Sequence, residues 1–392
     1  MDMTEKKRKL KVLHTTTRLV LGGGVEKNIY HTIQNLQDEF EFHLSCGAEC
    51  HDDLFKQLPQ LRLIICNHLV NTIHPLKDLK ALWFYYRLIK KEKYDIVHTH
   101  ETKASFITKL AAWLAGCPYI IYGLHGVTFN DPMSRLKRKF YIGLEKLTIG
   151  CANLVVSVGQ NTIDAYHQEK IGLKIPYTII RSGIDTQAYL RETLQSETER
   201  QAFRQKLSIA PNDIILINVG RFSFSKAQRY AIEAFSVLQQ KHPQLKMLLV
   251  GEGELLEECR KLSVRLNIPS SSIQFLGYRK DIPALLSASD IFLFTSLREG
   301  LPRVLVEASL LQLPIATFDV EGAAEIIENG KTGFISPALD IEKLIFNTEQ
   351  LILSPEVRMH FGQSSRLRVI QEWDMHRMAD RIRETYNNIN CT

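Results

Sequence analysis

The chain has 392 residues, which is more than one ordinary hydrophobic core accommodates, so we expect two domains. Hydrophobic residues make up 45% and charged residues 23%, which excludes an intrinsically disordered chain. The formal net charge of +6 suits phosphorylated ligands or an anionic membrane surface, but it is too small for a typical nucleic-acid-binding protein.

Cysteine usage and hydropathy predict a cytoplasmic protein. Seven scattered cysteines indicate free thiols in a reducing compartment, and Cys46, Cys50 and His51 lack a second ligand pair at zinc-site spacing, so no metal site is predicted. The charged residues 6–9 are not followed by the apolar run of a signal peptide. The longest apolar stretch, residues 110–124, contains Pro118 and is shorter than the ~20 residues of a membrane span.

Short apolar runs alternate with amphipathic stretches through the first half of the chain. The predicted strands are residues 10–14, 42–46, 61–66, 95–98, 119–124, 154–158 and 177–180. Between them lie patterns that keep one helical face apolar, as in Leu79, Leu82, Trp83, Tyr86 and Ile89. This alternation predicts βαβ units and a parallel sheet covered on both faces.

The polar, helix-prone segment 187–210 indicates a domain boundary, after which the same alternation restarts. The predicted strands there are residues 214–219, 246–250, 273–276, 291–294 and 314–317. The expected α/β fold therefore has two Rossmann-like doubly wound domains that face each other across a cleft. We assign residues 1–185 to an acceptor-binding domain, 186–365 to a nucleotide-sugar-binding domain, and 366–392 to a C-terminal helix that crosses back to the first domain.

Ligands bind beyond the carboxyl ends of the strands in open parallel sheets, so the turns that follow the strands are the candidate sites. Gly22, Gly23 and Gly24 open a helix and let backbone N–H groups approach an anion, although a flexible turn would look the same. His125, placed between glycines at a strand end, can hydrogen-bond a ligand hydroxyl or serve acid–base chemistry, although a lone histidine is more often structural.

In the second half, Arg221 and Lys226 follow a strongly apolar strand, and two cations there suit a diphosphate. The most specific pattern is Ser296-Leu297-Arg298-Glu299-Gly300-Leu301-Pro302-Arg303-Val304-Leu305-Val306-Glu307-Ala308. Its helix is apolar in nearly every direction, so Glu307 needs either a salt bridge with Arg303 or a ligand's hydroxyl groups. The chain lacks an Asp-x-Asp pair, a Walker loop and a Gly-x-Ser-x-Gly elbow.

Together these turns resemble the retaining GT-B glycosyltransferases of family 4, also called glycosyl transferases group 1. The resemblance covers nearly the whole chain and rests on Gly22-Gly23-Gly24-Val25-Glu26, His125-Gly126, Ser182-Gly183-Ile184-Asp185, Gly220-Arg221 with Lys226, Gly251-Glu252-Gly253, Glu299 with Glu307, Asp319-Val320-Glu321-Gly322 and Glu325-Ile326-Ile327. It implies a hexosyltransferase that moves a sugar from a nucleotide diphosphate donor, UDP-linked in most such proteins, to a glycan or lipid-linked acceptor.

The resemblance also implies the site residues. Arg221 and Lys226 would neutralise the diphosphate in place of a metal, so neither metal nor cofactor is expected. Glu307 would hold the ribose, and the turn Glu299-Gly300-Leu301 would contact the sugar or its phosphate. Backbone at Tyr278, Arg279 and Lys280 would frame the base, and His125 with Gly23 and Gly24 would close over the sugar.

The family mechanism would be front-face displacement with retention, in which the departing phosphate accepts the proton. Four residues depart from the family pattern: Ser182, Ala227, Gln312 and Arg303. Ser182 stands where asparagine is common, Ala227 where glycine or asparagine usually follows the lysine, and Gln312 where glycine is common. Arg303 could compete with ribose for Glu307.

Residues 135–144 are basic and aromatic, and Leu136, Phe140, Leu144 and Leu147 share one helical face. This pattern fits peripheral contact with an anionic membrane and equally fits an ordinary domain helix. Other functions stay open: a glycosyltransferase with a small-molecule acceptor such as a natural product or inositol, a nucleotide-sugar epimerase or hydrolase, and a non-catalytic partner subunit that keeps the fold.

Overall fold

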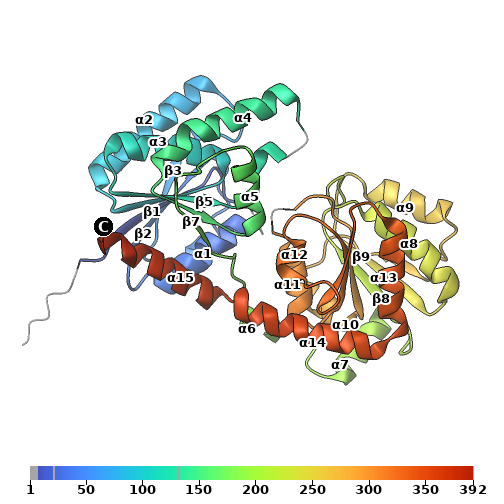
Figure 1. Ribbon diagram of the computed structural model, residues 1–392. Coiled ribbons are helices and arrows are strands. Elements are labelled where there is room, and N and C mark those ends of the chain that lie inside the picture. Colours follow the sequence, from blue (N-terminus) through green and yellow to red (C-terminus); the bar gives the residue numbers. More distant parts are fainter. Residues whose placement is uncertain (1–7, 21–22, 131–132, 300, 392) are drawn as a thin grey trace, which may run out of the picture. The chain divides into compact units, whose positions relative to one another are not determined.

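The computed structural model describes residues 8–20, 23–130, 133–299 and 301–391 (Figure 1). The chain divides into two compact units: unit 1 comprises Met1–Gly183 with Met375–Thr392, and unit 2 comprises Ile184–Asp374. We describe each unit by itself.

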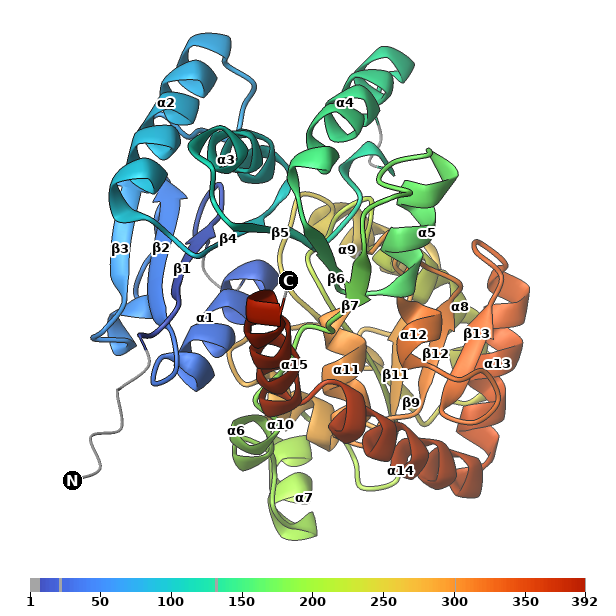
Figure 2. The same ribbon diagram turned by 60° about the vertical axis from the view of Figure 1, so that its left-hand side comes forward.

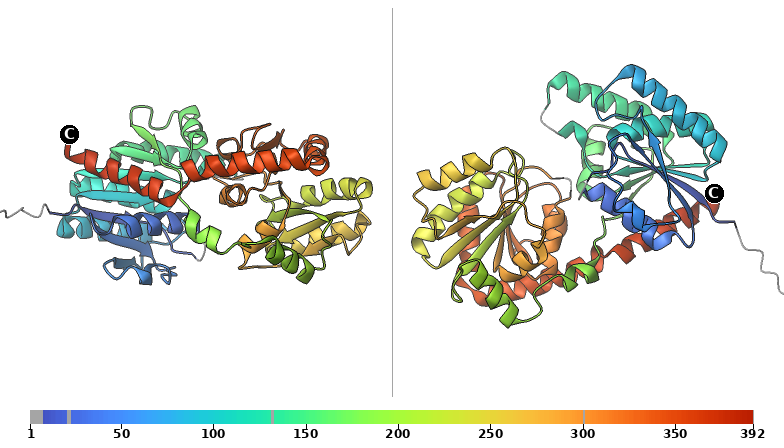
Figure 3. Two further views of the ribbon diagram at one scale, coloured as in Figure 1. Left: turned by 90° about the horizontal axis from the view of Figure 1, so that it is seen from below. Right: turned by 180° about the vertical axis from the view of Figure 1, so that it is seen from behind.

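The unit boundaries differ slightly from the predicted 185 and 365. The chain enters unit 2 at Ile184 and leaves it after Asp374. Near these two ends, the backbone N–H of Ile184 donates to the carbonyl of Trp373 at 2.8 Å, so both ends belong to unit 2. Residues 366–374 belong there because α14 (Pro355–Glu372) is one continuous helix that packs against α11 (Arg303–Leu310). Only the residues from Met375 onward return to unit 1, and Figure 3 shows the chain passing from α14 to α15.

Unit 1 is built on a parallel sheet, which has seven strands within the described residues, in the order β3-β2-β1-β4-β5-β6-β7. In chain order the strands are β1 (Lys11–Thr15), β2 (Glu41–Gly47), β3 (Arg62–Cys66), β4 (Ile96–His100), β5 (Tyr119–Leu124), β6 (Leu154–Ser157) and β7 (Tyr177–Ile179).

Helices cover both faces of this sheet (Figure 2). They are α1 (Gly24–Leu36), α2 (Pro75–Glu92), α3 (Thr102–Ala115), α4 (Arg135–Thr148), α5 (Gln160–Gln168) and α15 (Met375–Asn387), with short 3-10 turns at Phe55–Gln57, Thr128–Asn130, Ile149–Cys151 and Asn388–Cys391. One apolar cluster joins α1 and α15 to one face, and another joins α2 and α3 to the opposite face.

Unit 2 repeats the plan with a parallel sheet, six-stranded over the described residues, in the order β10-β9-β8-β11-β12-β13. Its strands are β8 (Ile214–Val219), β9 (Leu245–Val250), β10 (Ile273–Phe275), β11 (Ile291–Phe294), β12 (Ile315–Phe318) and β13 (Gly333–Ser336). Its remaining helices are α6 (Thr186–Arg191), α7 (Glu197–Lys206), α8 (Gln228–Lys241), α9 (Leu256–Arg265), α10 (Ile282–Ala288), α12 (Ala323–Ile326) and α13 (Ile341–Leu353).

The prediction of two doubly wound parallel sheets is confirmed. Each predicted strand exists within a few residues of its expected position, and β13 is the strand that the prediction missed. In both sheets the order reverses beside the first strand, between β1 and β4 and between β8 and β11. Ligands of such folds bind at this switch point.

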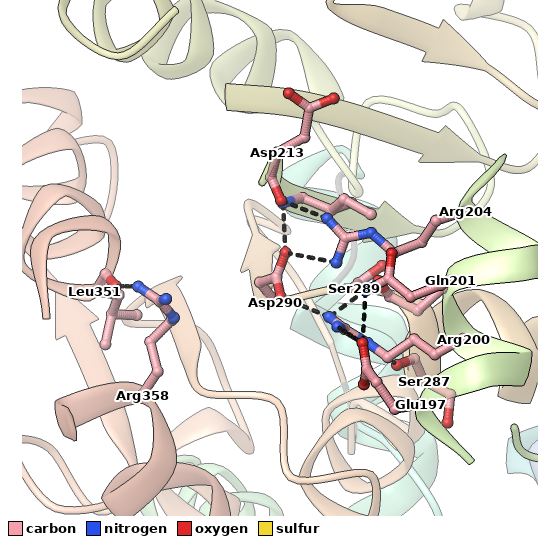
Figure 4. Close-up of polar contacts among 12 residues, drawn as sticks. Glu197, Arg200, Gln201, Arg204, Asp213, Ser287, Ser289, Asp290, Leu351 and Arg358 are labelled. Carbon is pink, nitrogen blue, oxygen red and sulfur yellow. Dashed lines mark hydrogen bonds and ion pairs between the residues drawn. The ribbon is translucent and has the colours of Figure 1, made fainter. Parts of the chain in front are cut away.

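The polar segment that follows the unit boundary is anchored to the amino end of unit 2's sheet through Asp290 (Figure 4). The Asp290 carboxylate lies 2.7 Å from Arg200 Nη2 and accepts a hydrogen bond from the backbone N–H of Ile215 at 2.8 Å. Arg204, which is buried, lies 3.5 Å from the same carboxylate, and burial lowers its pKa. These contacts hold α7 against β8 and β11, at the end of the sheet opposite the candidate site.

Candidate active site

In unit 2, the two loops at the switch point are bound to each other. The first follows β8 and carries Lys226; the second follows β11 and carries Glu299. The backbone N–H of Leu297 donates to the carbonyl of Ser225 at 2.7 Å, which fixes the relative position of the loops. The geometry of the side chains on these loops is therefore set by backbone contacts between neighbouring parallel strands.

Lys226 and Glu299 form a largely enclosed ion pair. Lys226 Nζ lies 2.5 Å from Glu299 Oε1, and the two side chains are 27% and 11% exposed. The ammonium also lies 6.0 Å from the ring centroid of Phe294, the last residue of β11. A charge pair this enclosed interacts more strongly than a surface pair, because water screens it less. The structure thus unites two residues that the sequence placed in separate turns.

Arg221, on the same loop as Lys226, is an exposed cation. Its side chain is 75% exposed, and its ion pair with Glu254 at 3.3 Å is exposed on both sides. Exposed pairs of this kind contribute little, about 0–1 kcal/mol, so the guanidinium can exchange Glu254 for a ligand's phosphate at small cost. The sequence did not single out Glu254, because a lone acidic residue in a loop carries no pattern.

Two glycines let neighbouring loops approach closely at the same edge of the sheet. A Cβ on Gly251 would lie 2.1 Å from the carbonyl oxygen of Gly220, and one on Gly253 would lie 2.2 Å from that of Phe222. Their φ angles of +135° and +154° also favour glycine. The Gly251-Glu252-Gly253 motif therefore keeps the backbone beside Arg221 compact.

Glu307 has the protein neighbour that the sequence suggested, and a second one. The Glu307 carboxylate raises the pKa of Arg303, while burial, the larger effect, lowers it. Burial raises the pKa of Tyr189, and the neighbouring Glu307 raises it further. No local pattern predicted Tyr189, because it lies on α6, more than a hundred residues before Glu307.

Three further residues of unit 2 were predicted for the donor site: Arg279, Gly300 and Leu301. Two of the three guanidinium nitrogens of Arg279, Nε and Nη2, donate to the Asp281 carboxylate at 2.7 and 2.5 Å, so this side chain is already paired. Leu301 packs against the core of unit 2 beneath α11. Gly300 lies outside the described residues.

In unit 1, His125 follows β5 and is partly exposed. Its Nε2 lies 2.8 Å from Nδ1 of His100, and burial lowers its pKa to about 4. His125 is therefore neutral at physiological pH, and one of its two nitrogens is already engaged. The sequence analysis did not single out His100; the His98-Thr99-His100 spacing, which puts both histidines on one face of a strand, is the signal that could have found it.

The glycine loop before α1 is partly filled by a side chain. Gly23 precedes the helix, which begins at Gly24, and Gly22 lies outside the described residues. A Cβ on Gly23 would lie 1.8 Å from Glu26 Oε2, and Glu26 Oε1 accepts from the backbone N–H of Val20 at 3.0 Å. Glu26 is buried, and burial raises its pKa. An anion at this loop would therefore meet the Glu26 carboxyl group.

Solved structures share this fold. The UDP complex of HepE from Anabaena superposes with a TM-score of 0.81 at 22% identity, covering 97% of this chain and all of that one. Sucrose-phosphate synthase from Thermosynechococcus elongatus has a TM-score of 0.78 at 16% identity, with coverages of 98% and 100%. The two doubly wound units and these likenesses define a protein of the GT-B class.

Sequence comparison gives the family. Residues 22–188 match the model described as Glycosyltransferase Family 4, and residues 199–368 match Glycosyl transferases group 1. The chain belongs to the group 1 glycosyltransferases of the GT-B fold and is an enzyme of that kind.

The names of two relatives describe transfer to diphospho-undecaprenol-linked sugars. The UDP-Gal:alpha-D-GlcNAc-diphosphoundecaprenol alpha-1,3-galactosyltransferase of Escherichia coli is 25% identical over 386 residues, covering 96% of this chain and 97% of that protein. The N,N'-diacetylbacillosaminyl-diphospho-undecaprenol alpha-1,3-N-acetylgalactosaminyltransferase of Campylobacter jejuni is 24% identical, with coverages of 86% and 92%.

Proposed function

We propose that this enzyme transfers a hexose, with retention and without a metal, from a UDP-sugar to a glycan or lipid-linked acceptor in polysaccharide or glycoconjugate synthesis. The observation that carries the donor site is the grouping of Lys226, Glu299 and Arg221 at the switch point of unit 2. The names of the E. coli and C. jejuni relatives, which act on diphospho-undecaprenol-linked sugars, support the acceptor class.

The charges of the site suit stabilisation of a departing diphosphate. Arg221 offers a planar fork and Lys226 a point charge, which together supply positive charge where a leaving phosphate becomes more negative. Glu299, now paired with Lys226, would exchange that contact for the sugar hydroxyls as the phosphate takes the ammonium. The departing phosphate itself would accept the acceptor's proton, so no protein nucleophile is needed.

Nucleotide binding tests the donor site. We expect UDP at a hundredfold excess over its Kd to stabilise the protein by about 2.7 kcal/mol, which raises the Tm of a unit this size by roughly 5–10 °C. Lys226→Ala and Glu307→Ala should abolish most of this rise. Lys261→Ala, which removes an exposed lysine from α9, is the matched control and should keep it.

The alternatives give different outcomes in the same assay. A larger rise with GDP or ADP than with UDP would change the proposed donor. If no nucleotide raises the Tm of the native chain, the proposed donor site at Lys226, Glu299 and Arg221 is wrong. We expect the sugar-transfer activity to survive exhaustive EDTA treatment. Loss of this activity with EDTA, and its recovery on adding Mg²⁺, would contradict the metal-free mechanism.

We further propose that α4 rests on an anionic membrane surface. None of the helices among the described residues is long and apolar enough to span a bilayer. On α4, however, Leu136 and Leu147 are 81% and 77% exposed, and Lys137 and Lys139 lie exposed on the same helix. Exposed leucines beside lysines suit the boundary between lipid headgroups and acyl chains.

Liposome sedimentation tests this second proposal. Each lysine near an anionic bilayer contributes about 1 kcal/mol, so Lys137→Gln with Lys139→Gln should weaken binding to anionic vesicles about thirtyfold. Lys261→Gln on α9 should leave binding unchanged. Equal binding to neutral and anionic vesicles would contradict the proposal.

A further inference from the structure

A row of four histidines and one tyrosine crosses the centre of unit 1's sheet. His14 on β1 and His98 on β4 are register partners, and His100 lies two residues further along the same face. His125 follows the neighbouring strand β5, and Tyr386 reaches this face from α15. All except the partly exposed His125 are buried, with exposures of 0–2%. We call these five residues the histidine row.

Four hydrogen bonds join the histidine row end to end. Tyr386 Oη lies 2.8 Å from His98 Nδ1 and 3.2 Å from His14 Nε2. His14 Nδ1 lies 2.8 Å from His100 Nε2, and His100 Nδ1 lies 2.8 Å from His125 Nε2. Two nitrogens remain at the ends: His98 Nε2, which is buried and has no partner among the described residues, and Nδ1 of His125.

The number of protons in the row exceeds the number of its hydrogen bonds by one. Burial lowers the pKa of His14 to about 3 and that of His125 to about 4, and it lowers the pKa values of His98 and His100 well below their ordinary range. Each neutral imidazole carries one N–H, and Tyr386 carries one O–H. Four rings and one phenol thus hold five protons for four bonds, so the fifth proton must stand at one end.

The two ends differ in what they offer that proton. On His98 Nε2 it would create a buried N–H donor without an acceptor, the kind of orphan that native proteins avoid most strictly. On Nδ1 of the partly exposed His125, at the carboxyl edge of the sheet, it can meet solvent or a ligand.

We propose that the histidine row places its fifth proton on His125 Nδ1, so that His125 is a fixed hydrogen-bond donor to an acceptor oxygen of the bound substrate. Tyr386, His14, His98 and His100 are then positioning residues, because each bond in the row fixes the tautomer of the next. The substrate contact rests on the proposed function, whereas the tautomer does not.

This arrangement makes His125 selective. A ligand oxygen that accepts a hydrogen bond meets the N–H directly. A ligand group that can only donate, such as an ammonium, would require all four bonds of the row to reverse and would leave the orphan donor on His98. The row therefore favours hydroxyl or phosphate oxygens over cations at His125, and it makes His125 a donor rather than a base.

Nitrogen NMR of the full chain tests the tautomer directly. In protein carrying ¹⁵N-labelled histidine at pH 7.5, long-range ¹H–¹⁵N correlations distinguish Nδ1–H from Nε2–H, and single histidine variants assign the signals. We expect the Nδ1–H form for His14, His98, His100 and His125 alike. The Nε2–H form at His125 would overturn the proposal.

A metal ion is the competing use of these nitrogens, since ligand atoms of His14, His98 and His100 lie within 4.8 Å of one another. Adding Zn²⁺ alone to EDTA-treated protein should leave the histidine signals and the Tm unchanged. A rise in Tm with loss of the Nδ1–H signals would overturn the proposal, because a bound metal takes lone pairs that the row shares with protons.

His100→Phe tests the coupling of His125 to the rest of the row. Removing the His100 imidazole takes away the N–H that His125 Nε2 accepts, so His125 should change from a single tautomer to a mixture of both. His43→Phe is the matched control, because His43 is also a buried histidine and its Nδ1 bonds Tyr94 Oη at 2.7 Å, outside the row. The control should cost similar stability yet keep His125 in one tautomer.

The outcomes separate the two proposals. An unchanged single tautomer of His125 in His100→Phe would show that the row does not position His125. Failure of every nucleotide to bind, with the Nδ1–H tautomer present, would remove the proposed function and leave the row intact.

Discussion

Gly123 makes room for the hydrogen bond between His100 and His125. A Cβ at this position would lie 2.8 Å from His100 Nδ1 and 3.2 Å from His125 Nε2, and 3.0 Å from the carbonyl oxygen of Thr99. Gly126, on the other side of His125, has no atom within 4 Å of such a Cβ. The two glycines look alike in the sequence but have different surroundings.

Alanine substitution should reveal this difference. Gly123→Ala should destabilise the protein by about 1–3 kcal/mol, since an added methyl group in a packed site forces neighbouring groups apart. It should also move the NMR signals of His125. Gly126→Ala should change stability by less than about 0.5 kcal/mol. Urea unfolding of both variants measures the effect, and equal costs would contradict this account of Gly123.

Two residues that depart from the family pattern have left-handed backbone conformations. Ala227, which precedes α8, has a φ of +49°, and Gln312, in the turn between α11 and β12, has a φ of +61°. Left-handed backbone costs a residue with a Cβ roughly 1–2 kcal/mol and costs glycine almost nothing. Glycine would adopt both conformations almost without strain, whereas Ala227 and Gln312 carry the cost of a Cβ.

Gln312→Gly should therefore stabilise the protein. The exposed side chain loses little contact, and relief of the left-handed strain should raise the free energy of unfolding by up to about 1 kcal/mol. Gln363→Gly, the same exchange at an exposed site within α14, should instead cost about 1 kcal/mol. Thermal unfolding of the two variants measures whether each substitution raises or lowers stability. A loss of stability in Gln312→Gly would contradict the strain argument.

The hydrophobic pattern of the sequence was sufficient to predict elements whose formation depends on residues close together in the chain. Buried strands such as β8 and β9 are continuous apolar runs, so the sequence predicted them, whereas β13 is a four-residue strand that begins with glycine and ends with serine. Lys226 and Glu299 were predicted as site residues because both follow such strands.

Contacts between distant segments could not be predicted. Lys226 and Glu299 are 73 residues apart, and Tyr386 lies 372 residues after His14. Tyr189 reaches Glu307 from a separate helix that carries no motif. Such partners are set by how helices pack on a sheet, which periodicity within one segment does not specify.

Each unit has its own hydrophobic core, and the two units differ in their titratable groups. The histidine row belongs to unit 1, whereas the proposed donor site at Lys226 belongs to unit 2. Protons and nucleotides should therefore act on different parts of the molecule: acid should destabilise unit 1, and a bound nucleotide should stabilise unit 2.

The acid sensitivity of unit 1 follows from its four neutral histidines. In the unfolded chain they titrate near pH 6.5, whereas in the folded chain burial lowers the pKa of His14 to about 3 and that of His125 to about 4, and holds those of His98 and His100 well below the ordinary value. Below pH 6.5 the unfolded chain thus binds more protons, so the free energy of unfolding falls as pH falls. Four such groups remove up to about 5 kcal/mol per pH unit, against a total stability of roughly 5–15 kcal/mol.

We therefore expect unit 1 to unfold first as the pH falls from 6.5 towards 4. Hydrogen exchange read by mass spectrometry at pH 7.5 and pH 5 should show protection lost in β1, β4 and β5 while β8 and β11 stay protected.

His98→Gln removes one titrating group and should make the loss of stability with falling pH less steep by about a quarter, since each group contributes the same slope. UDP should leave the acid midpoint of unit 1 unchanged while raising the Tm of unit 2. Simultaneous loss of protection in both units would show instead that they unfold as one cooperative body, so that protonation of the histidine row determines the acid stability of the whole enzyme.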